Sequence, residues 1–474
     1  MSSPKFIPPI NAQGPNIKAP PRNLIFMFDG TGDEIDDDVT NVIQFSRLLY
    51  NHPKELDPTK GIGMWKAGSN RSKIPFYGPV SRTVDKAIAW NFEDHVMDAY
   101  KTLTEQYKEG DKICLFGFSR GSYTARTVAA VVGLFGLLPP ESRNDDSIFE
   151  TIKTIYFGPT RKSFSPDSIN EFHVKLKEFL EQHRTAMVMI EFVGVWDTVN
   201  SVGLITTTGA MYTSSAPNLK TFRHAIALDE RRARFDRSMW YKKENDGKKL
   251  KTDVEQVWFA GAHCDVGGGS VSNDTKPNLA NIPLRWMIRE CFKKETGIIF
   301  AANELQSHLG MDPLCLYPIV KPRPAPLPLR DDSIVQTVES VNKSNSEKKC
   351  PVTATSTEEE HDLWDSLAPI YDMLVIKWYT WDLFERFRMK KWDPVRGNTH
   401  EANWWAGRRI YVNVPPSKEA KKYIFDKKVR VHRSVRTRMM AKSMDPKGPY
   451  VPAASLQVGG QNISVDSDLV EWVD

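Results

Sequence analysis

The sequence has few of the features that mark a secreted, membrane-spanning or disulfide-stabilised protein. Its five cysteines are scattered and none stands in a CxxC pair, which argues against a zinc ribbon and a disulfide framework. The proline-rich start of the chain contains no apolar segment typical of a secretory signal. The longest apolar run, Val128–Leu138, is shorter than the about 20 residues that a membrane-spanning helix needs. These absences predict a cytoplasmic protein in a reducing compartment.

An excess of charge of one sign is also missing. The net charge of +5 is small for 474 residues, so we expect no nucleic-acid partner. The EF-hand, HExxH and P-loop patterns are absent, so we expect no metal and no cofactor. The hydrophobic content of 40% and the charged content of 26% are ordinary for a globular protein.

The most informative stretch is Lys112–Leu138, KICLFGFSRGSYTARTVAAVVGLFGLL. An apolar run leads into Gly117, Ser119 and Gly121, and a small-residue helical segment follows. A Gly-x-Ser-x-Gly sequence between a strand and a helix is typical of the nucleophile elbow of α/β-hydrolases. The glycines permit the tight turn, and the serine is then placed at a helix N-terminus, which favours developing negative charge. The alternative is a structural serine in a glycine-rich helix cap.

Apolar strands alternate with amphipathic helices on both sides of this stretch. This alternation predicts an α/β fold, an α/β-hydrolase-like, doubly wound and mostly parallel sheet with helical insertions. The basic segment that contains His224 is interpreted as helical. The other predicted strands are 24–28, 187–195 and 254–260, and the other predicted helices are 40–50, 83–108, 147–157, 170–183 and 279–294.

Polar residues follow each predicted strand, where the carboxyl ends of parallel strands form a ligand-binding edge. Ser119, Asp197 and His263 follow three of them, in the chain order Ser, Asp, His that α/β-hydrolases use. Such a set supplies a nucleophile, a carboxylate that orients the imidazole, and a base. The sequence therefore predicts these three as catalytic residues, with His224 as the rival base.

An oxyanion formed at Ser119 needs backbone donors. The NH of Arg120, directly after the nucleophile, is the first candidate, and the turn after the first strand offers Gly30 or Thr31 as the second. Asp29 is predicted to brace that turn. Asp265 is predicted to support the site, either as a second carboxylate for His263 or as a cap for the glycine loop after it.

Two other classes of function stay open at this point. A metal-dependent phosphoesterase would use Asp29, Asp197, His263 and Asp265, helped by the acidic run that includes Asp33, Asp36, Asp37 and Asp38. A catalytically silent α/β-hydrolase that serves as an interaction module is the third hypothesis.

The second half of the chain has a different composition. Six of the thirteen tryptophans lie within 364–405, and ten Lys/Arg lie within 418–442. This extension is predicted either to pack on the core with a solvated basic face, or to contact an anionic membrane surface and guide an amphiphilic ester. The predicted divisions are a disordered proline-rich tail (1–21), the catalytic domain (22–320), a flexible linker or insertion (321–361), a C-terminal helical, Trp-rich extension packed on the catalytic domain (362–455) and a tail (456–474).

Several phrases occur together and in order, among them FDGTGD, FGFSRGSYTAR, GVWDTV, HAIALDERR and WFAGAHCDVGGG. Over about residues 22–295 the chain resembles a family of α/β-hydrolases long catalogued as a domain of unknown function. Its bacterial members include type VI secretion lipase effectors with phospholipase activity, and many uncharacterised fungal proteins share the domain. The resemblance implies a serine esterase acting on a small-molecule or lipid ester, with Ser119, Asp197 and His263 at the motif positions. It does not imply that this chain is a secreted effector.

Overall fold

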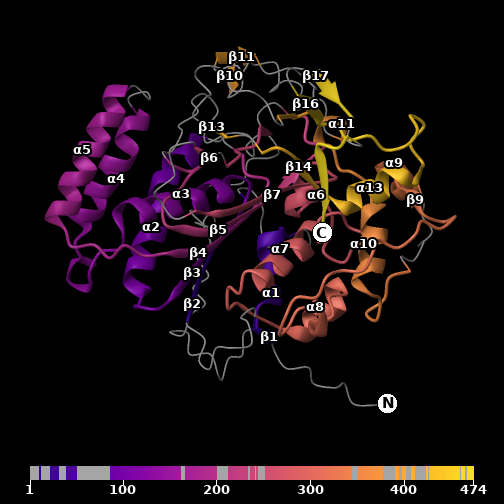
Figure 1. The fold of residues 1–474 in the computed structure, drawn as a ribbon, viewed down its shortest axis with the longest axis horizontal. Coiled ribbons are helices and arrows are strands. Elements are labelled where there is room, and N and C mark those ends of the chain that lie inside the picture. Colours follow the sequence, from indigo (N-terminus) through magenta and orange to yellow (C-terminus); the bar gives the residue numbers. More distant parts are fainter. Residues whose placement is uncertain are drawn as a thin grey trace.

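A sheet of seven strands forms the centre of the protein, with helices on both of its faces (Figure 1). Every pair of neighbouring strands in this sheet is parallel. The predicted α/β class, a doubly wound parallel sheet, is therefore confirmed. The computed structural model describes residues 10–11, 22–30, 39–50, 86–161, 166–199, 212–232, 235–240, 242–243, 251–343, 351–376, 390–393, 398–401, 407–411, 423–424, 426–458, 461–464 and 467–474.

The four predicted strands are present as β2 (Asn23–Phe28), β3 (Lys112–Phe118), β4 (Ile190–Trp196) and β7 (Asp253–Phe259). The first three are buried along nearly their whole length. Continuous apolar strands of this kind are expected where helices cover both faces of a sheet. The spatial order of the sheet is β18-β14-β7-β5-β4-β3-β2, which places β3 and β4 side by side.

The prediction is wrong for the segment around His224, which is a strand and not a helix. This strand, β5 (Leu219–Ala227), lies between β4 and β7. Arg223 and His224 are fully buried in it. The Arg223 guanidinium lies 2.6 Å from Glu290 and 3.0 Å from Asp253, so its charge is paired inside the protein. Because Arg223 and His224 interrupt the apolar residues of β5, the sequence does not show the continuous apolar run that is typical of a buried strand.

Two further strands come from the last part of the chain. β14 (Val429–His432) pairs with β7, and β18 (Val470–Val473) pairs with β14. The predicted tail at 456–474 is therefore wrong for the residues of β18. The C-terminal extension is predicted to pack on the catalytic domain. At β14 it instead contributes a strand to the central sheet.

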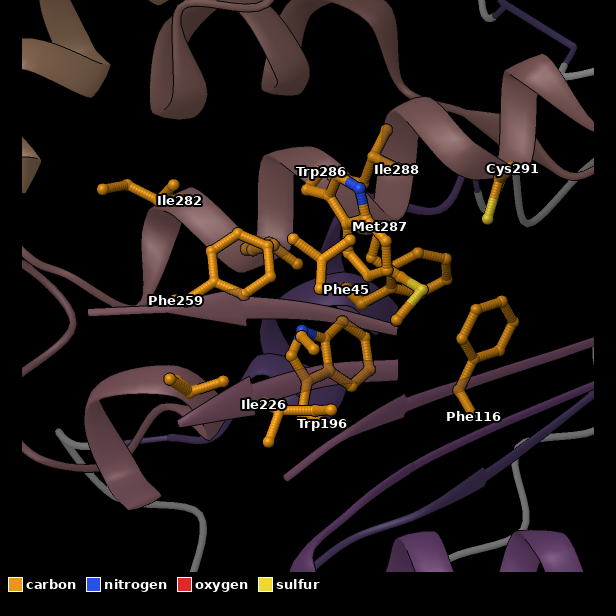
Figure 2. Packing of buried hydrophobic residues seen from close by; sticks show 14 of the residues in the cluster. Phe45, Phe116, Trp196, Ile226, Phe259, Ile282, Trp286, Met287, Ile288 and Cys291 are labelled. Carbon is orange, nitrogen blue, oxygen red and sulfur yellow. The ribbon is translucent and has the colours of Figure 1, made fainter. Parts of the chain in front are cut away.

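Two hydrophobic layers lie on the two faces of the sheet. Figure 2 shows part of one of them. On one face, Phe116 and Trp196 of the sheet pack with Phe45 and Trp286 from the covering helices. Burying one such side chain contributes about 1.5–3 kcal/mol, so this layer contributes strongly to folding. This face is covered by α1 (Asn41–Leu48) and α7 (Asn281–Lys293). On the other face α3 (Ser119–Phe135) lies against the sheet, α2 (Lys86–Gln106) and α5 (Pro166–Gln182) pack on α3, and α4 (Asp146–Arg161) packs on α2 and α5.

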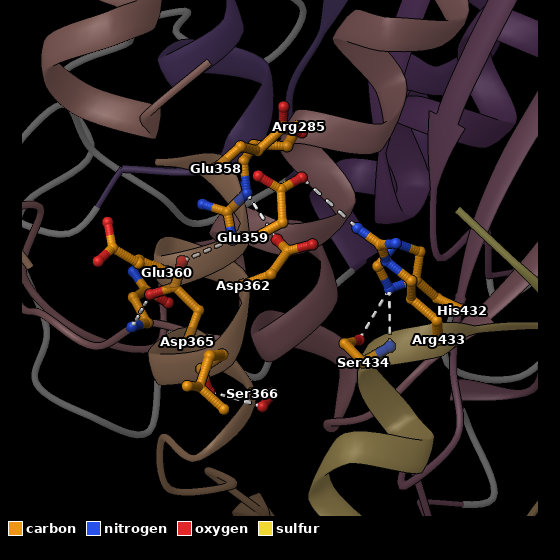
Figure 3. Close-up of polar contacts among 12 residues, drawn as sticks. Arg285, Glu358, Glu359, Glu360, Asp362, Asp365, Ser366, His432, Arg433 and Ser434 are labelled. Carbon is orange, nitrogen blue, oxygen red and sulfur yellow. Dashed lines mark hydrogen bonds and ion pairs between the residues drawn. The ribbon is translucent and has the colours of Figure 1, made fainter. Parts of the chain in front are cut away.

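A buried ionic cluster joins α7 to the helix α10 (Glu358–Ser366) (Figure 3). Arg285 on α7 lies 2.6 Å from Asp362, and Arg289 lies 2.8 Å from Glu358. Arg323 lies 2.7 Å from Asp362, so this part of the predicted linker packs on α10. The predicted boundary between 361 and 362 is wrong, because it falls inside that helix.

Smaller elements complete the described part of the chain. Across the described residues, no helix combines the length and the apolar character that crossing a bilayer requires. The paired short strands are β1 (Ile10–Asn11) with β8 (Ile299–Phe300), β13 (Tyr423–Ile424) with β6 (Lys242–Lys243), β15 (Lys442–Ser443) with β9 (Ile334–Val335), β10 (Lys390–Asp393) with β11 (Asn398–Glu401), and β16 (Ser455–Val458) with both β12 (Arg409–Tyr411) and β17 (Gln461–Ile463). The remaining helices are α6 (His263–Gly267), α8 (Ala302–Leu309), α9 (Val338–Lys343), α11 (Met373–Ile376) and α13 (Arg433–Met440), with 3-10 turns at Pro140–Ser142 and Pro313–Cys315.

Candidate active site

Ser119 stands at the junction of β3 and α3 with a left-handed backbone, φ 57°. Such a conformation costs a non-glycine residue on the order of 1–3 kcal/mol and needs support from its surroundings. A Cβ atom on Gly117 would lie 2.6 Å from the carbonyl oxygen of Gly121, and one on Gly121 would lie 2.1 Å from that of Phe28. Both glycines of the motif are therefore sterically required, and the sharp turn places the serine at the carboxyl edge of the sheet.

Asp197 and His263 lie at neighbouring positions along the same edge. Asp197 follows β4 directly, and its NH donates to the carbonyl of Ala225 on β5 at 2.7 Å. His263 begins α6, shortly after β7. The hydroxyl of Ser122 lies 2.7 Å from the Gly117 carbonyl oxygen and 2.9 Å from the Trp196 carbonyl oxygen. It thereby joins the end of β3, which carries Ser119, to the end of β4, which carries Asp197.

The three side chains form a continuous line of hydrogen bonds. Nε2 of His263 lies 2.8 Å from Oγ of Ser119, and Nδ1 of His263 lies 2.6 Å from Oδ2 of Asp197. Ser119, His263 and Asp197 are 7%, 3% and 0% exposed. This order of contacts allows Nδ1–H to donate to the carboxylate while Nε2 accepts the serine proton. The structure thus brings together the three residues that the sequence predicts as catalytic.

Burial and charge set the protonation of this pair in the expected direction. Burial raises the pKa of Asp197, but the Arg408 guanidinium and the hydrogen bond from His263 outweigh it and hold that pKa well below its usual range. Burial lowers the pKa of His263, and the Asp197 carboxylate offsets this only in part. At neutral pH a neutral imidazole therefore stands beside an ionised carboxylate, which is the state that a general base requires.

The imidazole of His263 is confined by its neighbours. The ring centroid of Phe118 lies 4.6 Å from that of His263, and the ring of Phe235 approaches edge-on at 4.9 Å. The backbone NH of His263 donates to Glu230 at 3.3 Å, and Glu230 pairs with Arg232 at 2.7 Å. Glu230 and Arg232 belong to the HAIALDERR phrase, so their place beside the histidine gives part of that phrase a structural reason.

Arg408 is the residue at this site that the sequence analysis missed. Its guanidinium binds both oxygens of Asp197, with NH1 2.5 Å from Oδ1 and NH2 2.9 Å from Oδ2. The residue is 6% exposed and lies far along the chain from the other members of the site. The only signal was the phrase WWAGRRIYVNV, in which an arginine pair precedes a short alternating segment.

The turn after β2 holds the predicted oxyanion donors. Asp29 accepts hydrogen bonds from the NH of Gly30 at 2.8 Å and from the hydroxyl of Thr40 at 2.6 Å, as expected of a carboxylate that braces the turn. The Gly30 NH is thus directed to Asp29 in this structure. Thr31 lies outside the described residues. Arg120 occupies the first turn of α3, directly after Ser119.

Asp265 and His224 have partners other than the imidazole of His263. Asp265 accepts from the NH groups of Ala262 and Tyr371, both at 2.9 Å, so it caps the start of α6. Its burial raises its pKa to about 7. Nε2 of His224 accepts from the NH of Thr198 at 3.1 Å, and burial lowers the pKa of His224 to about 3. His224 therefore supports the turn that carries Asp197.

Within the part of the chain that the structure describes, no group of three or more His, Cys, Asp or Glu side chains is arranged to hold a metal ion. The carboxylates of the phosphoesterase alternative have other partners: Asp29 bonds the turn, Asp197 bonds Arg408 and His263, and Asp265 bonds backbone NH groups. Asp33, Asp36, Asp37 and Asp38 lie outside the described residues. No observation on the described residues favours that alternative.

Residues 22–290 match the model of the type VI secretion family described as phospholipase effector Tle1-like, catalytic domain. Among curated proteins, the uncharacterized protein YEL023C of Saccharomyces cerevisiae is 28% identical over 225 residues, which is 45% of this chain and 32% of the yeast protein. The chain therefore spans about a third of the length of this relative.

Two solved structures overlap with the fold in part. The crystal structure of an uncharacterized protein from Pseudomonas aeruginosa has a TM-score of 0.31 at 14% identity, over 59% of this chain and 47% of that chain. The Tle1 effector bound to the VgrG spike of the type 6 secretion system has a TM-score of 0.25 at 15% identity, over 54% of this chain and 53% of that chain. At TM-scores this low the overlap carries no functional argument.

Proposed function

The chain belongs to the family of Tle1-like phospholipase effector catalytic domains, and from this premise we propose that it is a serine hydrolase that cleaves carboxylic esters of lipids. The family description favours a lipase-type or phospholipase-type hydrolase. The observation that carries the serine mechanism is the line of hydrogen bonds from Ser119 through His263 to Asp197, at 2.8 and 2.6 Å.

In the proposed reaction Ser119 is the nucleophile. Its Oγ attacks the ester carbonyl carbon while Nε2 of His263 takes the hydroxyl proton. Asp197 holds the imidazole in the required tautomer and stabilises its charged form. The tetrahedral intermediate collapses to an acyl-enzyme as His263 passes the proton to the departing alkoxide. Water then attacks the acyl-enzyme by the same sequence of proton transfers and releases the acid.

The negative oxygen of the intermediate needs donors near Ser119. The NH of Arg120 follows the nucleophile at the N-terminal end of α3, where the helix dipole favours negative charge. The turn at Gly30 and Thr31 stays the predicted source of the second donor. With Gly30 directed to Asp29, Thr31 becomes the stronger of the two candidates.

Labelling with a fluorophosphonate probe tests the proposal directly. The probe phosphonylates a serine only where a base activates it, so modification is expected at Ser119, identified by peptide mass spectrometry. A panel of esters and phospholipids, measured with and without a chelator, gives the substrate class. No labelling at Ser119 together with chelator-sensitive hydrolysis would favour the metal phosphoesterase. No labelling and no hydrolysis would favour the silent interaction module.

The pH dependence of kcat/KM is expected to show an acid limb with a midpoint below about 6.5, the ordinary value for histidine. The base must be neutral, and burial lowers the pKa of His263, so the neutral form persists to lower pH than in an exposed histidine. Hydrolysis should therefore decline only on the acid side of that value and be level at pH 7. A rate that stays level down to the lowest pH at which the protein is folded would exclude a histidine base.

A control variant separates His263 from a second titrating group. Asp265 lies two residues away and has its pKa raised to about 7 by burial, so it also titrates within this range. Replacing it, as Asp265→Asn, removes that titration. The acid limb of this variant should keep its midpoint if His263 is the group responsible.

Contact with an anionic membrane surface stays a prediction. Of the described basic residues within 418–442, Lys427, Lys428, Arg436 and Lys442 are exposed, whereas Arg433 bonds Asp474 at 2.6 Å and Arg438 is buried. Among the six tryptophans, the side chain of Trp364 is half-buried, and those of the other five lie outside the description. Arg436 lies over the ring of Trp472 and Lys442 lies 3.7 Å from Asp331, so the adjacent Lys427 and Lys428 are the pair chosen to test attraction.

Reversing both charges, as Lys427→Glu/Lys428→Glu, is expected to weaken binding to anionic vesicles about tenfold or more at low salt, because each basic residue near such a surface contributes about 1 kcal/mol. Sedimentation with phosphatidylserine vesicles at 50 mM and 500 mM salt measures this. The matched control is Lys175→Glu/Lys177→Glu, two exposed lysines on α5. If vesicle binding does not change with salt, with lipid charge or with the Lys427→Glu/Lys428→Glu change, then Lys427 and Lys428 only form solvated surface.

A further inference from the structure

The carboxylate of Asp197 is held from outside the region that matches the family. Arg408 makes two parallel contacts to it, at 2.5 and 2.9 Å, and also donates to the Ala227 carbonyl at 3.1 Å. Its side chain is 4% exposed and that of Asp197 is fully buried. Bidentate arginine–carboxylate pairs fix orientation as well as charge. The match ends at residue 290, so the matched segment alone lacks this partner.

The backbone around Arg408 is fixed on both sides. The NH of Ser455 donates to the Arg408 carbonyl at 2.8 Å, and the NH of Ala454 donates to Leu228, on the loop after β5, at 2.8 Å. A Cβ atom on Gly407 would lie 1.7 Å from the carbonyl oxygen of Ala453, so the preceding residue must be glycine. The guanidinium is therefore delivered to Asp197 by a close-packed segment and not by a free arm.

Charge around the imidazole balances only when Arg408 is counted. The buried charged groups that face the His263–Asp197 pair are Asp197 and Glu230, which are negative, and Arg232 and Arg408, which are positive. Cys264 and Asp265, on α6, are further titratable neighbours among the described residues, and His224 is neutral at physiological pH because burial lowers its pKa to about 3. Without Arg408, the other partners of the Asp197 carboxylate are the His263 ring and the NH of Ala227 at 2.9 Å.

We propose that Arg408 is a positioning residue of the active site, which clamps Asp197 in the orientation that receives His263 and makes hydrolysis depend on the C-terminal segment 407–411. This inference rests on the proposed serine hydrolase function. The clamp acts in two ways. It fixes the carboxylate rotamer, and its positive charge makes the imidazole less basic. The second effect extends the neutral form of His263 to lower pH.

The rate of fluorophosphonate labelling at Ser119, measured from pH 5 to 9, tests the proposal in the full-length chain. Arg408→Met keeps the length of the side chain and removes its charge. We expect labelling at pH 7 to slow about 10- to 100-fold, as for other residues that orient a catalytic or ligand group. The acid limb should move upward by about one pH unit, because a positive charge near the imidazole is lost.

Arg408→Lys and Arg409→Met complete the set. Lysine keeps the charge but cannot span both carboxylate oxygens, so its acid limb should stay near that of the wild type while labelling slows about tenfold. The neighbouring Arg409 pairs through its backbone with Ser455 of β16, and its carbonyl accepts from Arg237. No described contact joins its side chain to Asp197 or His263, so Arg409→Met should label at the wild-type rate. Circular dichroism and thermal melting establish that each variant is folded.

The labelling results distinguish a failure of the proposed role of Arg408 from a failure of the proposed serine hydrolase function. If the wild-type chain is not labelled at Ser119, the proposed serine hydrolase function is contradicted. A wild-type chain that labels, with Arg408→Met labelling at the same rate and with the same acid limb, overturns the role of Arg408 alone. Slow labelling with an unmoved acid limb also overturns it, because that is the effect of general loosening. If Arg408→Met does not fold, Arg408→Lys decides: labelling at the wild-type rate would contradict a bidentate clamp.

Discussion

Ser119→Ala is expected to lower kcat for ester hydrolysis by about 10⁴- to 10⁶-fold, as removal of the nucleophile does in other serine hydrolases. The change deletes the oxygen that lies 2.8 Å from Nε2 of His263. Stability should change little, because alanine meets the same left-handed backbone, φ 57°, that serine already accepts. Hydrolysis of a lipid ester and the melting temperature, measured on the same preparation, test both statements.

Ser119→Gly is the matched variant for this experiment. It also lacks the hydroxyl, but glycine adopts a positive φ without penalty. Both variants should therefore be equally inactive, with the glycine variant at least as stable as the alanine variant. Near wild-type hydrolysis by either one would exclude Ser119 as the nucleophile and with it the proposed mechanism.

Asp197→Asn is expected to lower kcat by about 10⁴-fold, the size of the effect where an asparagine replaces the carboxylate of such a site. An amide can direct its NH₂ group at Nδ1 of His263, which then takes the tautomer that leaves Nε2 protonated and unable to accept the serine proton. The same change leaves the buried Arg408 without its carboxylate. Breaking a buried pair by removing one partner costs about 3–5 kcal/mol, so the melting temperature should fall as well.

Asp229→Asn is the control for this second experiment. Asp229 is also buried, and it accepts from the NH groups of Gly261 and Ala453, but no described contact joins it to the imidazole of His263. It should lose stability without a 10⁴-fold loss of kcat, once active sites are counted by fluorophosphonate titration. Equal losses of kcat in the two variants would mean that Asp197 acts only through folding.

The edge of the site that depends on local chemistry is predictable from the sequence. Gly117 and Gly121 indicate the tight turn in the sequence, because a Cβ atom at either position would collide with backbone atoms. Asp197 and His263 are predictable because parallel strands bring their carboxyl ends to one edge of the sheet. The residues that follow three apolar strands, Ser119, Asp197 and His263, are therefore expected to lie close together. These signals lie within a few residues of the features that they predict.

Arg408, β5 and the outer strands depend on partners far away in the sequence. Arg223 looks like a surface residue until Glu290 and Asp253 are placed beside it. The strands β14 and β18 are four residues long and contain charged side chains, so their pattern is weak without the edge of β7. Arg408 follows Gly407 in a basic, tryptophan-rich stretch, and nothing in that stretch identifies a carboxylate after β4 as its partner.

Because β14 is the outer neighbour of β7, the outer edge of β7 stays without this partner for a certain time while the chain is synthesised. Strand β7 ends at Phe259, and its neighbour on the outer side begins at Val429. At about 5–20 residues per second, the ribosome needs on the order of ten seconds or more to make the intervening chain. For that interval the chain has not yet supplied a partner for the outer NH and CO groups of β7, and an open strand edge can pair with other chains.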